Sequence, residues 1–200
     1  MTNTRLSKLF ITGCDEKGVW MLDWFLKNYR KHNDIEIHTI DFQEGLGWLE
    51  KPAAMRRASL LADKVCWLDT DCEVIGDISG IFDYTQPNKL TMAEDKPWST
   101  RRPGNAGKWH NSGVVAFENT PSILVDWELT CATQGGVGDQ EVLHSMISNP
   151  IQRMAKIEDL PNKYNVLRLQ HIDKTVPTDP RIYHWTGPKG KDHIRKLMNE

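Results

Sequence analysis

The sequence predicts an α/β protein with a central, mainly parallel β-sheet flanked by helices. Three short apolar segments, at 8–12, 35–42 and 64–68, have the length and composition of buried strands. Segments at 16–31 and 53–63 separate them and are expected to be helical. An alternation of strand and helix is typical of a parallel sheet with right-handed crossovers.

The first helix has the clearest periodic pattern. Apolar side chains recur at spacings of three and four, which places them on one helix face. They are Val19, Leu22, Phe25, Leu26 and Tyr29. The strand before this helix ends at Thr12-Gly13, the next strand closes at Asp41, and the third leads into Asp69-Thr70-Asp71.

The second half of the chain is less regular. We expect strands at 90–93, 113–117 and 181–185, helices at 121–131 and 139–146, and a C-terminal helix after a Gly- and Lys-rich turn. The polar segment 94–110 contains several Arg, Lys, Pro and Gly residues and is expected to be a mobile loop. No linker or internal repeat is present, so residues 1–200 are interpreted as a single domain.

Composition excludes some classes of protein. The 200 residues contain 25 Lys and Arg against 27 Asp and Glu, a formal charge of −2, so the usual argument for a nucleic-acid or polybasic membrane binder is missing. No segment approaches the roughly 18 apolar residues of a membrane span. The first ten residues lack the apolar region of a signal peptide. We therefore expect a cytoplasmic protein without a membrane span.

The four cysteines indicate a reducing compartment. Cys14, Cys66, Cys72 and Cys131 form no Cys-x-x-Cys pair and no dense framework, so we expect all four thiols to be reduced. Cys66 lies in an apolar run and is expected in the core.

Acidic and small residues gather at the strand ends. Ligands of open parallel sheets bind beyond the carboxyl ends of the strands. Asp69 and Asp71 are separated by one residue at such an end, so their side chains would point to one side and repel each other unless a cation lies between them. Carboxylate oxygens suit Mg²⁺ or Mn²⁺, which usually also bind substrate phosphates. A lone Asp-x-Asp is also common as a solvated acidic turn.

A second constellation lies near the C-terminus. His184 ends a predicted strand and is followed by a Gly-rich turn that carries Lys189 and Lys191. The histidine would complete a metal shell, and glycine backbone with lysine charge would hold a diphosphate. Taken alone, this segment also fits an ordinary surface turn.

At these residues the chain resembles a known family. Residues 63–78 are similar to the DxD segment of GT-A-fold glycosyltransferases, particularly glycosyltransferase family 8 and small virus- or phage-type relatives. Four further pieces occur in the family's order: Thr-Gly-x-Asp at 12–15, Asn-Ser-Gly-Val at 111–114, Asp-Gln at 139–140 and His-x-x-Gly at 184–187. The resemblance implies the GT-A fold. It also implies metal-dependent transfer of a sugar from a nucleotide-diphosphate sugar, with UDP favoured, to a glycan or other hydroxyl acceptor.

The resemblance also implies roles for individual residues. Mn²⁺ or Mg²⁺ would be held by Asp69, Asp71 and His184. The nucleotide-sugar would be bound by Thr12, Gly13, Asp15, Asp41, Arg57 (or Arg56), Asp95, Asn111, Ser112, Gly187, Lys189 and Lys191. Asp139 and Gln140 would lie at the reaction centre. One departure is that family 8 usually places a lysine six residues after the histidine, where this chain has Gly190 between two lysines.

Eight tryptophans are an unusual number for 200 residues. Aromatic faces pack in cores and also stack on sugar rings. Trp20, Trp24 and Trp67 follow core patterns, whereas Trp98, Trp109 and Trp185 are candidates for sugar stacking.

Other functions remain open at the level of sequence. A haloacid-dehalogenase-like phosphatase also uses Asp-x-Asp after an apolar strand, but normally on the first strand and with Thr or Val where this chain has Glu73. A sugar nucleotidyltransferase would require a basic, Gly-rich loop after the first strand, whereas residues 14–16 of this chain are acidic. A non-catalytic nucleotide-sugar-binding module is the third alternative. Retaining chemistry would use Gln140 near the anomeric carbon, inverting chemistry would use Asp139 as a base, and Asp139 also suits a plain helix start.

Overall fold

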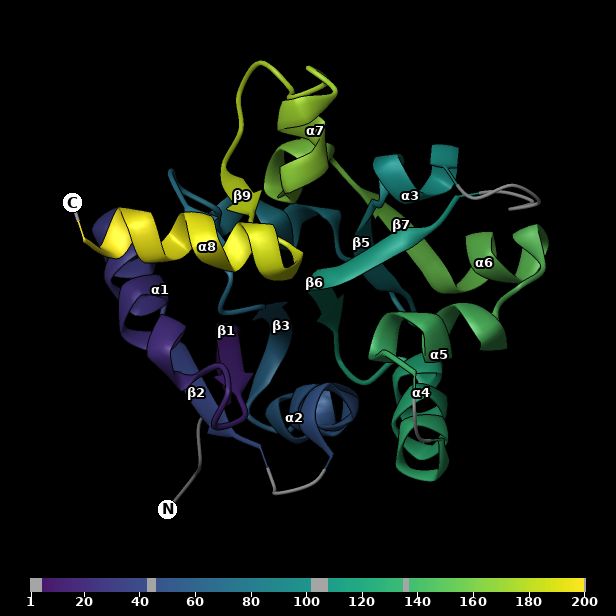
Figure 1. Ribbon diagram of the computed structural model, residues 1–200. Coiled ribbons are helices and arrows are strands. Elements are labelled where there is room, and N and C mark those ends of the chain that lie inside the picture. Colours follow the sequence, from purple (N-terminus) through teal and green to yellow (C-terminus); the bar gives the residue numbers. More distant parts are fainter. Residues whose placement is uncertain (1–4, 43–45, 102–107, 135–136, 200) are drawn as a thin grey trace.

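A six-stranded sheet forms the centre of the protein, and the computed structural model describes residues 5–42, 46–101, 108–134 and 137–199 (Figure 1). The strand order is β2-β1-β3-β6-β5-β7. The strands are β1 (Leu6–Cys14), β2 (Ile37–Asp41), β3 (Ala62–Leu68), β5 (Leu90–Glu94), β6 (His110–Glu118) and β7 (Ile157–Leu160). Only β6 runs antiparallel to its neighbours in this sheet, so the predicted mainly parallel α/β architecture is confirmed.

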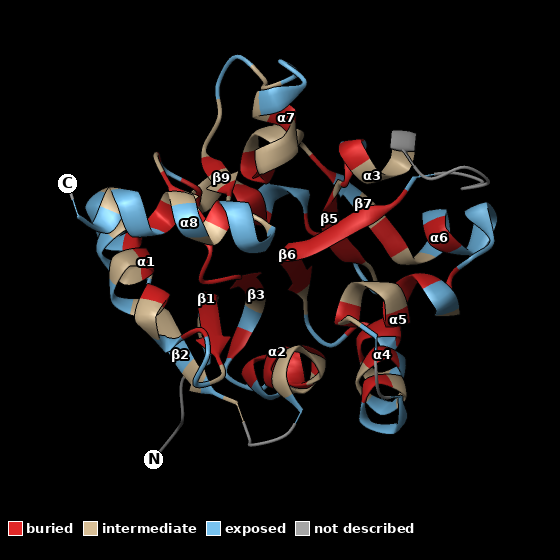
Figure 2. Cartoon of the chain, in the orientation of Figure 1, coloured by how far each residue is buried: buried red, intermediate tan, exposed pale blue. Residues whose placement is uncertain are grey.

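Helices cover both faces of this sheet (Figure 1). On one face α2 (Lys51–Ala58), α4 (Ser122–Thr133) and α5 (Asp139–Met146) pack into the first core cluster. On the other face lie α1 (Val19–His32) and the 3₁₀ segment η2 (Ser79–Tyr84). Strand β1 contributes to both cores, because successive strand residues point to opposite faces of the sheet. Leu9 and Ile11 belong to the first core cluster and Phe10 belongs to the second. Figure 2 shows the central strands as buried.

A small second sheet joins two distant parts of the chain. It contains β4 (Cys72–Val74), β9 (Ile182–His184) and β8 (Val166–Leu167), in the order β4-β9-β8. In the antiparallel pair β4·β9, Cys72 lies opposite His184. This pairing brings the Asp-x-Asp segment beside the histidine near the C-terminus.

Several boundaries differ from the sequence expectations. Helix α2 ends at Ala58 and β3 already begins at Ala62, a fully buried residue that pairs with Leu6 of β1. The expected loop 94–110 begins with helix α3 (Lys96–Arg101), and its residues 102–107 lie outside the described residues. Helices α6 (Pro150–Lys156) and α7 (Arg168–Ile172) were not expected.

The Gly- and Lys-rich segment is a helix start. Helix α8 (Gly187–Met198) begins within it, and Pro188 in its first turn suits that position because no hydrogen bond is lost there. Gly190 is required by packing, since a Cβ at this position would lie 1.9 Å from the carbonyl oxygen of Trp185. Short 3₁₀ segments η1 (Gly47–Glu50) and η3 (Asn162–Tyr164) complete the fold.

The cysteines and three tryptophans can be placed directly. All four thiols are free and buried, and Cys66 lies in the core as expected. Trp67 is fully buried and Trp24 packs partly against the core, whereas Trp20 is half-buried with the Arg195 guanidinium 4.6 Å above its ring. In the described part of the chain, no helix has the length and apolar character needed to cross a membrane.

Candidate active site

Polar side chains from four elements meet at the carboxyl edge of the central sheet. Strand β3 ends just before Asp69, β9 ends at His184, and α5 begins at Asp139. Because β6 is antiparallel, its first residues lie at the same edge. Together they surround a cavity of about 280 Å³. Its lining residues are Trp48, Lys51, Asp69, Asp71, Asn111, Ser112, Asp139, Gln140, Glu141, His184, Thr186, Gly187 and Lys191.

Asp71 and His184 form the closest acid–imidazole pair in this cavity. Asp71 Oδ1 lies 3.0 Å from His184 Nε2, and Asp69 Oδ2 lies 3.9 Å from the same nitrogen. Burial alone would lower the pKa of His184 and raise that of Asp71, but their attraction reverses both shifts. The three groups therefore favour positive charge placed between them.

The orientation of the His184 ring is set by neighbouring amides. His184 Nδ1–H donates to Asn165 Oδ1 over 3.0 Å, and Asn165 Nδ2 donates to Asn111 Oδ1 over 2.9 Å. The ring therefore presents Nε2 to the two carboxylates. A metal-binding histidine is commonly fixed in this way through its other nitrogen. The set of two carboxylates and one imidazole fits a divalent cation such as Mn²⁺ or Mg²⁺.

Cys72 Sγ also lies near Asp71 and His184, with the three potential ligand atoms within 4.8 Å of one another. Full burial and the two nearby aspartates raise the pKa of this thiol well above its ordinary value. Because the thiolate is the form that binds metals, Cys72 is a poor ligand here. Asp69, whose Oδ2 lies 3.9 Å from His184 Nε2, would be a better third ligand for a divalent cation.

The structure adds a residue that the sequence prediction missed. The ammonium of Lys51 is buried, 2.9 Å from Asp69 Oδ1 and 3.1 Å from Asp139 Oδ2, and it also donates to the Ser112 carbonyl over 3.2 Å. Burial would lower the pKa of Lys51, but Asp139 and Asp69 outweigh it and raise the pKa. Lys51 is therefore charged and links the Asp-x-Asp segment to the start of α5.

The basic residue expected in this place was Arg57, which the structure does not bring to the cavity. Arg57 pairs with Glu50 over 2.9 Å and lines a separate groove beside β2. The relevant signal was helix periodicity. Lys51 shares a helix face with the buried Ala54, Met55 and Ala58, at spacings of three, four and seven, whereas Arg57 is exposed.

An amide network fixes Gln140. Gln140 Oε1 accepts from Asn111 Nδ2 and from the Ser112 N–H, each over 3.0 Å. Its Nε2 donates to Asp95 Oδ2 over 3.3 Å. Burial raises the pKa of Asp95, although these hydrogen bonds oppose the shift. Asp95, Asn111, Ser112 and Gln140 are thus brought together, as the sequence suggested.

Packing of His184 explains why the Asn-Ser-Gly-Val segment has glycine at position 113. A Cβ on this residue would lie 2.0 Å from Cε1 of His184, so the imidazole packs directly on the backbone of β6. The Gly113 carbonyl also accepts the Asp69 N–H over 2.8 Å. This glycine therefore sets the distance between β6 and both candidate metal ligands.

The residues expected around the nucleotide base lie at the ends of β1 and β2. Thr12 is fully buried and its hydroxyl donates to the Leu68 carbonyl over 2.7 Å. A Cβ on Gly13 would lie 2.3 Å from the Ile40 carbonyl oxygen. Asp15 accepts the N–H groups of the turn that precedes α1, and Asp41 is exposed. None of the four is among the residues lining the 280 Å³ cavity.

The expected phosphate and sugar contacts divide in a similar way. Gly187 and Lys191 line the cavity, whereas Lys189 is exposed and is not among its lining residues. Trp48, which had no expected role, lines it, and the Lys191 ammonium lies 5.9 Å from its ring centre.

The three tryptophans expected to stack on sugars lie outside this lining. Trp109 is buried against His144, with 3.9 Å between ring centres. Trp185 lies against the rings of His171 and His193, and its Nε1 donates to Glu73 over 2.8 Å. Trp98 is half-buried in α3, and its backbone N–H donates to Asp95 Oδ1.

Several glycosyltransferases of known structure have the same overall architecture. No protein-family model matches the sequence, and sequence comparison finds no curated relative. The galactosyltransferase LgtC, solved with donor and acceptor sugar analogs, superposes with a TM-score of 0.67 at 12% identity, over 96% of this chain and 95% of LgtC. A glycosyltransferase involved in the glycosylation of the major capsid of PBCV-1 superposes with a TM-score of 0.65 at 12% identity, over 94% of this chain and 99% of the other. The chain has the GT-A fold.

A further GT-A structure shows how much of a larger chain the fold occupies. The glycosyltransferase GlyE of Streptococcus pneumoniae TIGR4 superposes with a TM-score of 0.62 at 18% identity, over 92% of this chain but 55% of GlyE. The present chain therefore spans about half of that protein. At these sequence identities the likeness establishes the fold alone, and the activity depends on the residues of the site.

Proposed function

We propose that this protein is a metal-dependent glycosyltransferase that transfers a sugar from a nucleotide-diphosphate sugar, with UDP favoured, to a hydroxyl of a glycan or other acceptor. One observation carries the proposal. A single cavity at the carboxyl edge of a GT-A sheet is lined both by the carboxylate–imidazole set and by the consecutive residues Asp139 and Gln140. The carboxylate–imidazole set suits a divalent cation bound to a diphosphate, and Asp139 with Gln140 suits a reaction centre.

The donor diphosphate would lie between the metal ligands and the start of α8. Asp69, Asp71 and His184 would hold Mn²⁺ or Mg²⁺, which when bound neutralises the charge of the departing diphosphate. Gly187 and Lys191 line the same cavity at the N-terminus of the 12-residue helix α8. Backbone N–H groups at a helix start, together with a lysine, favour phosphate oxygens.

Lys51 and the amide network position the reaction centre. Lys51 holds the Asp139 carboxylate through a direct ion pair, and Asp95 with Asn111 holds the Gln140 amide. The Asp139 Oδ2 atom is engaged by the Lys51 ammonium and is not presented to an acceptor hydroxyl. This favours a retaining outcome with Gln140 beside the anomeric carbon over an inverting one with Asp139 as base. LgtC also has a glutamine in its active site, since a solved active-site mutant of it carries glutamate in place of glutamine and superposes with a TM-score of 0.67 at 13% identity.

The alternatives predict different chemistry from the same residues. A phosphatase of the Asp-x-Asp type needs a free nucleophilic carboxylate, whereas Asp69 Oδ1 accepts from Trp67 Nε1 over 2.6 Å and faces Lys51. The aspartates also follow the third strand along the chain. A binding module would share the donor contacts but not turn the donor over.

The test compares the wild type with Asp71→Ala. Nucleotide-sugars are first screened for thermal stabilisation with and without Mn²⁺, since a bound donor stabilises the folded state by mass action. Release of the nucleotide diphosphate is then measured for the donors found. We expect Asp71→Ala to lose at least about a hundredfold of the Mn²⁺-dependent rate while remaining folded. Asp63→Ala, which removes an exposed carboxylate at the second residue of β3, is the matched control.

Three results would contradict the proposal. Full activity of Asp71→Ala, or of the wild type in excess chelator, would exclude the metal role. Release of phosphate from phosphomonoesters without use of any nucleotide-sugar would indicate a phosphatase. Donor binding without hydrolysis or transfer to any acceptor would indicate a binding module.

A further inference from the structure

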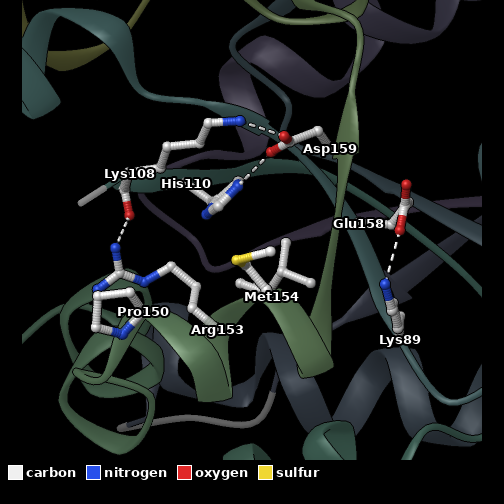
Figure 3. Close-up of a pocket in the computed structure, with 9 residues that line it drawn as sticks. Lys89, Lys108, His110, Pro150, Arg153, Met154, Glu158 and Asp159 are labelled. Carbon is white, nitrogen blue, oxygen red and sulfur yellow. Dashed lines mark hydrogen bonds and ion pairs between the residues drawn. The ribbon is translucent and has the colours of Figure 1, made fainter.

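A second cavity lies at the opposite edge of the central sheet from β2. It has a volume of about 420 Å³ and lies between the edge strand β7 and helix α6 (Figure 3). Pro150, Met154 and Ile157 form its apolar wall. Its polar lining residues are Lys89, Lys108, His110, Arg153, Glu158 and Asp159. Within the described residues, it shares no lining residue with the candidate active site.

Both carboxylates of this cavity are already neutralised. Glu158 pairs with Lys89 over 2.8 Å. Asp159 accepts from His110 Nε2 over 2.9 Å and from the Lys108 ammonium. The hydrogen bond from His110 in particular holds the pKa of Asp159 well below its ordinary value. These two acids therefore need no further cation.

Arg153 is a buried cation for which the described part of the chain supplies no carboxylate partner. Its side chain is 9% exposed, and its terminal nitrogens donate to the backbone carbonyls of Lys108 and Ser148. Its Nε is buried and has no hydrogen-bond partner among the described residues. An arginine keeps its charge in a protein, and a buried charge without a counter-ion is costly. An anion bound from solution would therefore stabilise the buried guanidinium.

His110 leaves a second buried nitrogen directed at the same place. The residue is 3% exposed, and its Nε2 is occupied by Asp159, but the described residues offer its Nδ1 no hydrogen-bond partner. Figure 3 shows the imidazole between Asp159 and the side chain of Arg153. Two unpartnered nitrogens thus converge on one cavity. Neither is used by the candidate active site.

Charge and apolar surface together define the ligand class. Three cations, Lys89, Lys108 and Arg153, face two carboxylates, so the lining carries a net positive charge even with His110 neutral. Met154 lines the cavity and is 74% exposed, so an apolar surface is available at its opening. A phosphate or carboxylate would accept a hydrogen bond from Arg153 Nε–H, and the hydroxyl of a monoanionic phosphate would donate to His110 Nδ1, which is the acceptor nitrogen of a neutral ring whose Nε2–H is bound to Asp159. An attached apolar group would contact Met154 and Ile157.

We propose that this cavity binds an organic anion, that is, a phosphate or carboxylate carried on an apolar group. Such a group occurs both in small soluble metabolites and in anionic lipid headgroups with the first part of their acyl chains. The site would be separate from the donor site. The two sites would nevertheless be connected through the protein. The backbone N–H of His110, which lines the second cavity, donates to His144 Nε2, and His144 lies on α5 one turn after Gln140.

The test uses hexyl phosphate, with hexanol as the uncharged control, titrated calorimetrically against the full chain. Hexyl phosphate should bind at least about tenfold more tightly than hexanol, because a charge-assisted hydrogen bond to a buried donor is worth at least that factor. Arg153→Met should remove this preference. Lys156→Met, on the same helix but outside the cavity lining, is the matched control and should keep it.

A second variant protects the test against misfolding, because Arg153 also holds two backbone carbonyls. Met154→Glu changes an exposed side chain at the cavity, so the fold should be retained, and its negative charge should weaken hexyl phosphate binding at least about tenfold. Sedimentation with phosphatidylcholine vesicles, with and without phosphatidic acid, then assigns the source. Binding only to vesicles with phosphatidic acid indicates a headgroup, and binding to hexyl phosphate alone indicates a soluble anion.

Two results would overturn the proposal. One is the absence of any preference of the wild type for hexyl phosphate over hexanol together with no binding to phosphatidic acid. The other is binding that persists in both Arg153→Met and Met154→Glu, or that UDP with Mn²⁺ displaces competitively. The latter would place the anion in the donor site.

Discussion

Replacing Lys51 with methionine tests the electrostatic centre of the site most directly. Methionine keeps an unbranched apolar side chain but removes the ammonium. Asp69 and Asp139, whose side chains are 13% and 10% exposed, would then face the cavity without their shared counter-ion. The change removes the ammonium and replaces the Cδ methylene by sulfur, so the effect reports the two ion pairs together with the hydrogen bond to the Ser112 carbonyl.

The expected loss follows from the burial of this triad. Removing one partner of a buried ion pair costs about 3–5 kcal/mol, because the other charge stays buried and unpaired. Two carboxylates depend on Lys51, so the upper part of that range is expected, a large share of the 5–15 kcal/mol that stabilise a typical domain. Lys64→Met, in strand β3, is the control: its side chain is 32% exposed and its ammonium lies 3.8 Å from Glu118, and such a pair contributes about 0–1 kcal/mol.

The assay is urea unfolding at neutral pH in the presence of chelator, followed by tryptophan fluorescence and circular dichroism. Chelator removes any cation that would compensate for the lost ammonium. The double variant Lys51→Met/Asp139→Asn removes one of the two stranded charges and should recover part of the loss. Asp139→Asn alone completes the double-mutant cycle.

The reasoning about Lys51 would be refuted by either of two results. One is a free energy of unfolding for Lys51→Met within about 1 kcal/mol of the wild type, which is the range of a surface pair. The other is a double variant that is no more stable than Lys51→Met.

Three further expectations concern neighbouring contacts. Gly113→Ala should displace the His184 ring, because the new Cβ would lie 2.0 Å from Cε1, and should weaken Mn²⁺ binding about tenfold or more by calorimetry; unchanged affinity would contradict the packing argument. Burial lowers the pKa of His144 from 6.5 to about 4, so the unfolded chain takes up its proton first and stability is lost as the pH falls between these values. Urea unfolding at pH 7 and pH 4.5 should show less of this loss, by at most about 3 kcal/mol, in His144→Gln; an identical pH dependence in both proteins would argue against a buried neutral imidazole. Lys191→Met should weaken UDP binding in Mn²⁺ about tenfold, whereas Arg57→Met, outside the cavity, should not; equal losses would restore Arg57 to the donor site.

Much of the framework was predictable because it depends on local pattern. The apolar runs before Asp41 and Asp69 are strands, and the periodic helix over 16–31 is α1 with shifted ends. Residue 139 as a helix start is also observed, in α5. These features follow from periodic burial within one segment, which the order of residues carries directly.

The missed elements are those with too few residues to show a period. Strands β4 and β8 have three and two residues, and helix α3 has six. Their existence depends on partners elsewhere in the chain. The pairing of β4 with β9 brings Asp71 to His184, and no spacing between those residues indicates it.

The same distinction separates Lys51 from Arg57. Both are basic residues on α2, and composition does not choose between them. Helical periodicity places Lys51 on the buried face of α2, but which groups that face meets is settled only when α2 packs against β6 and α5.

The sequence by itself determined the fold class, the order of the strand ends and the kinds of side chain that follow them, because alternation and helical periodicity are properties of neighbouring residues. Tertiary structure decided which cation stands between the buried carboxylates, which tryptophans are covered, and that a second, basic cavity forms behind β7. Burial, ion pairing and unpartnered donors arise only where segments distant in the chain meet, and no single segment encodes them.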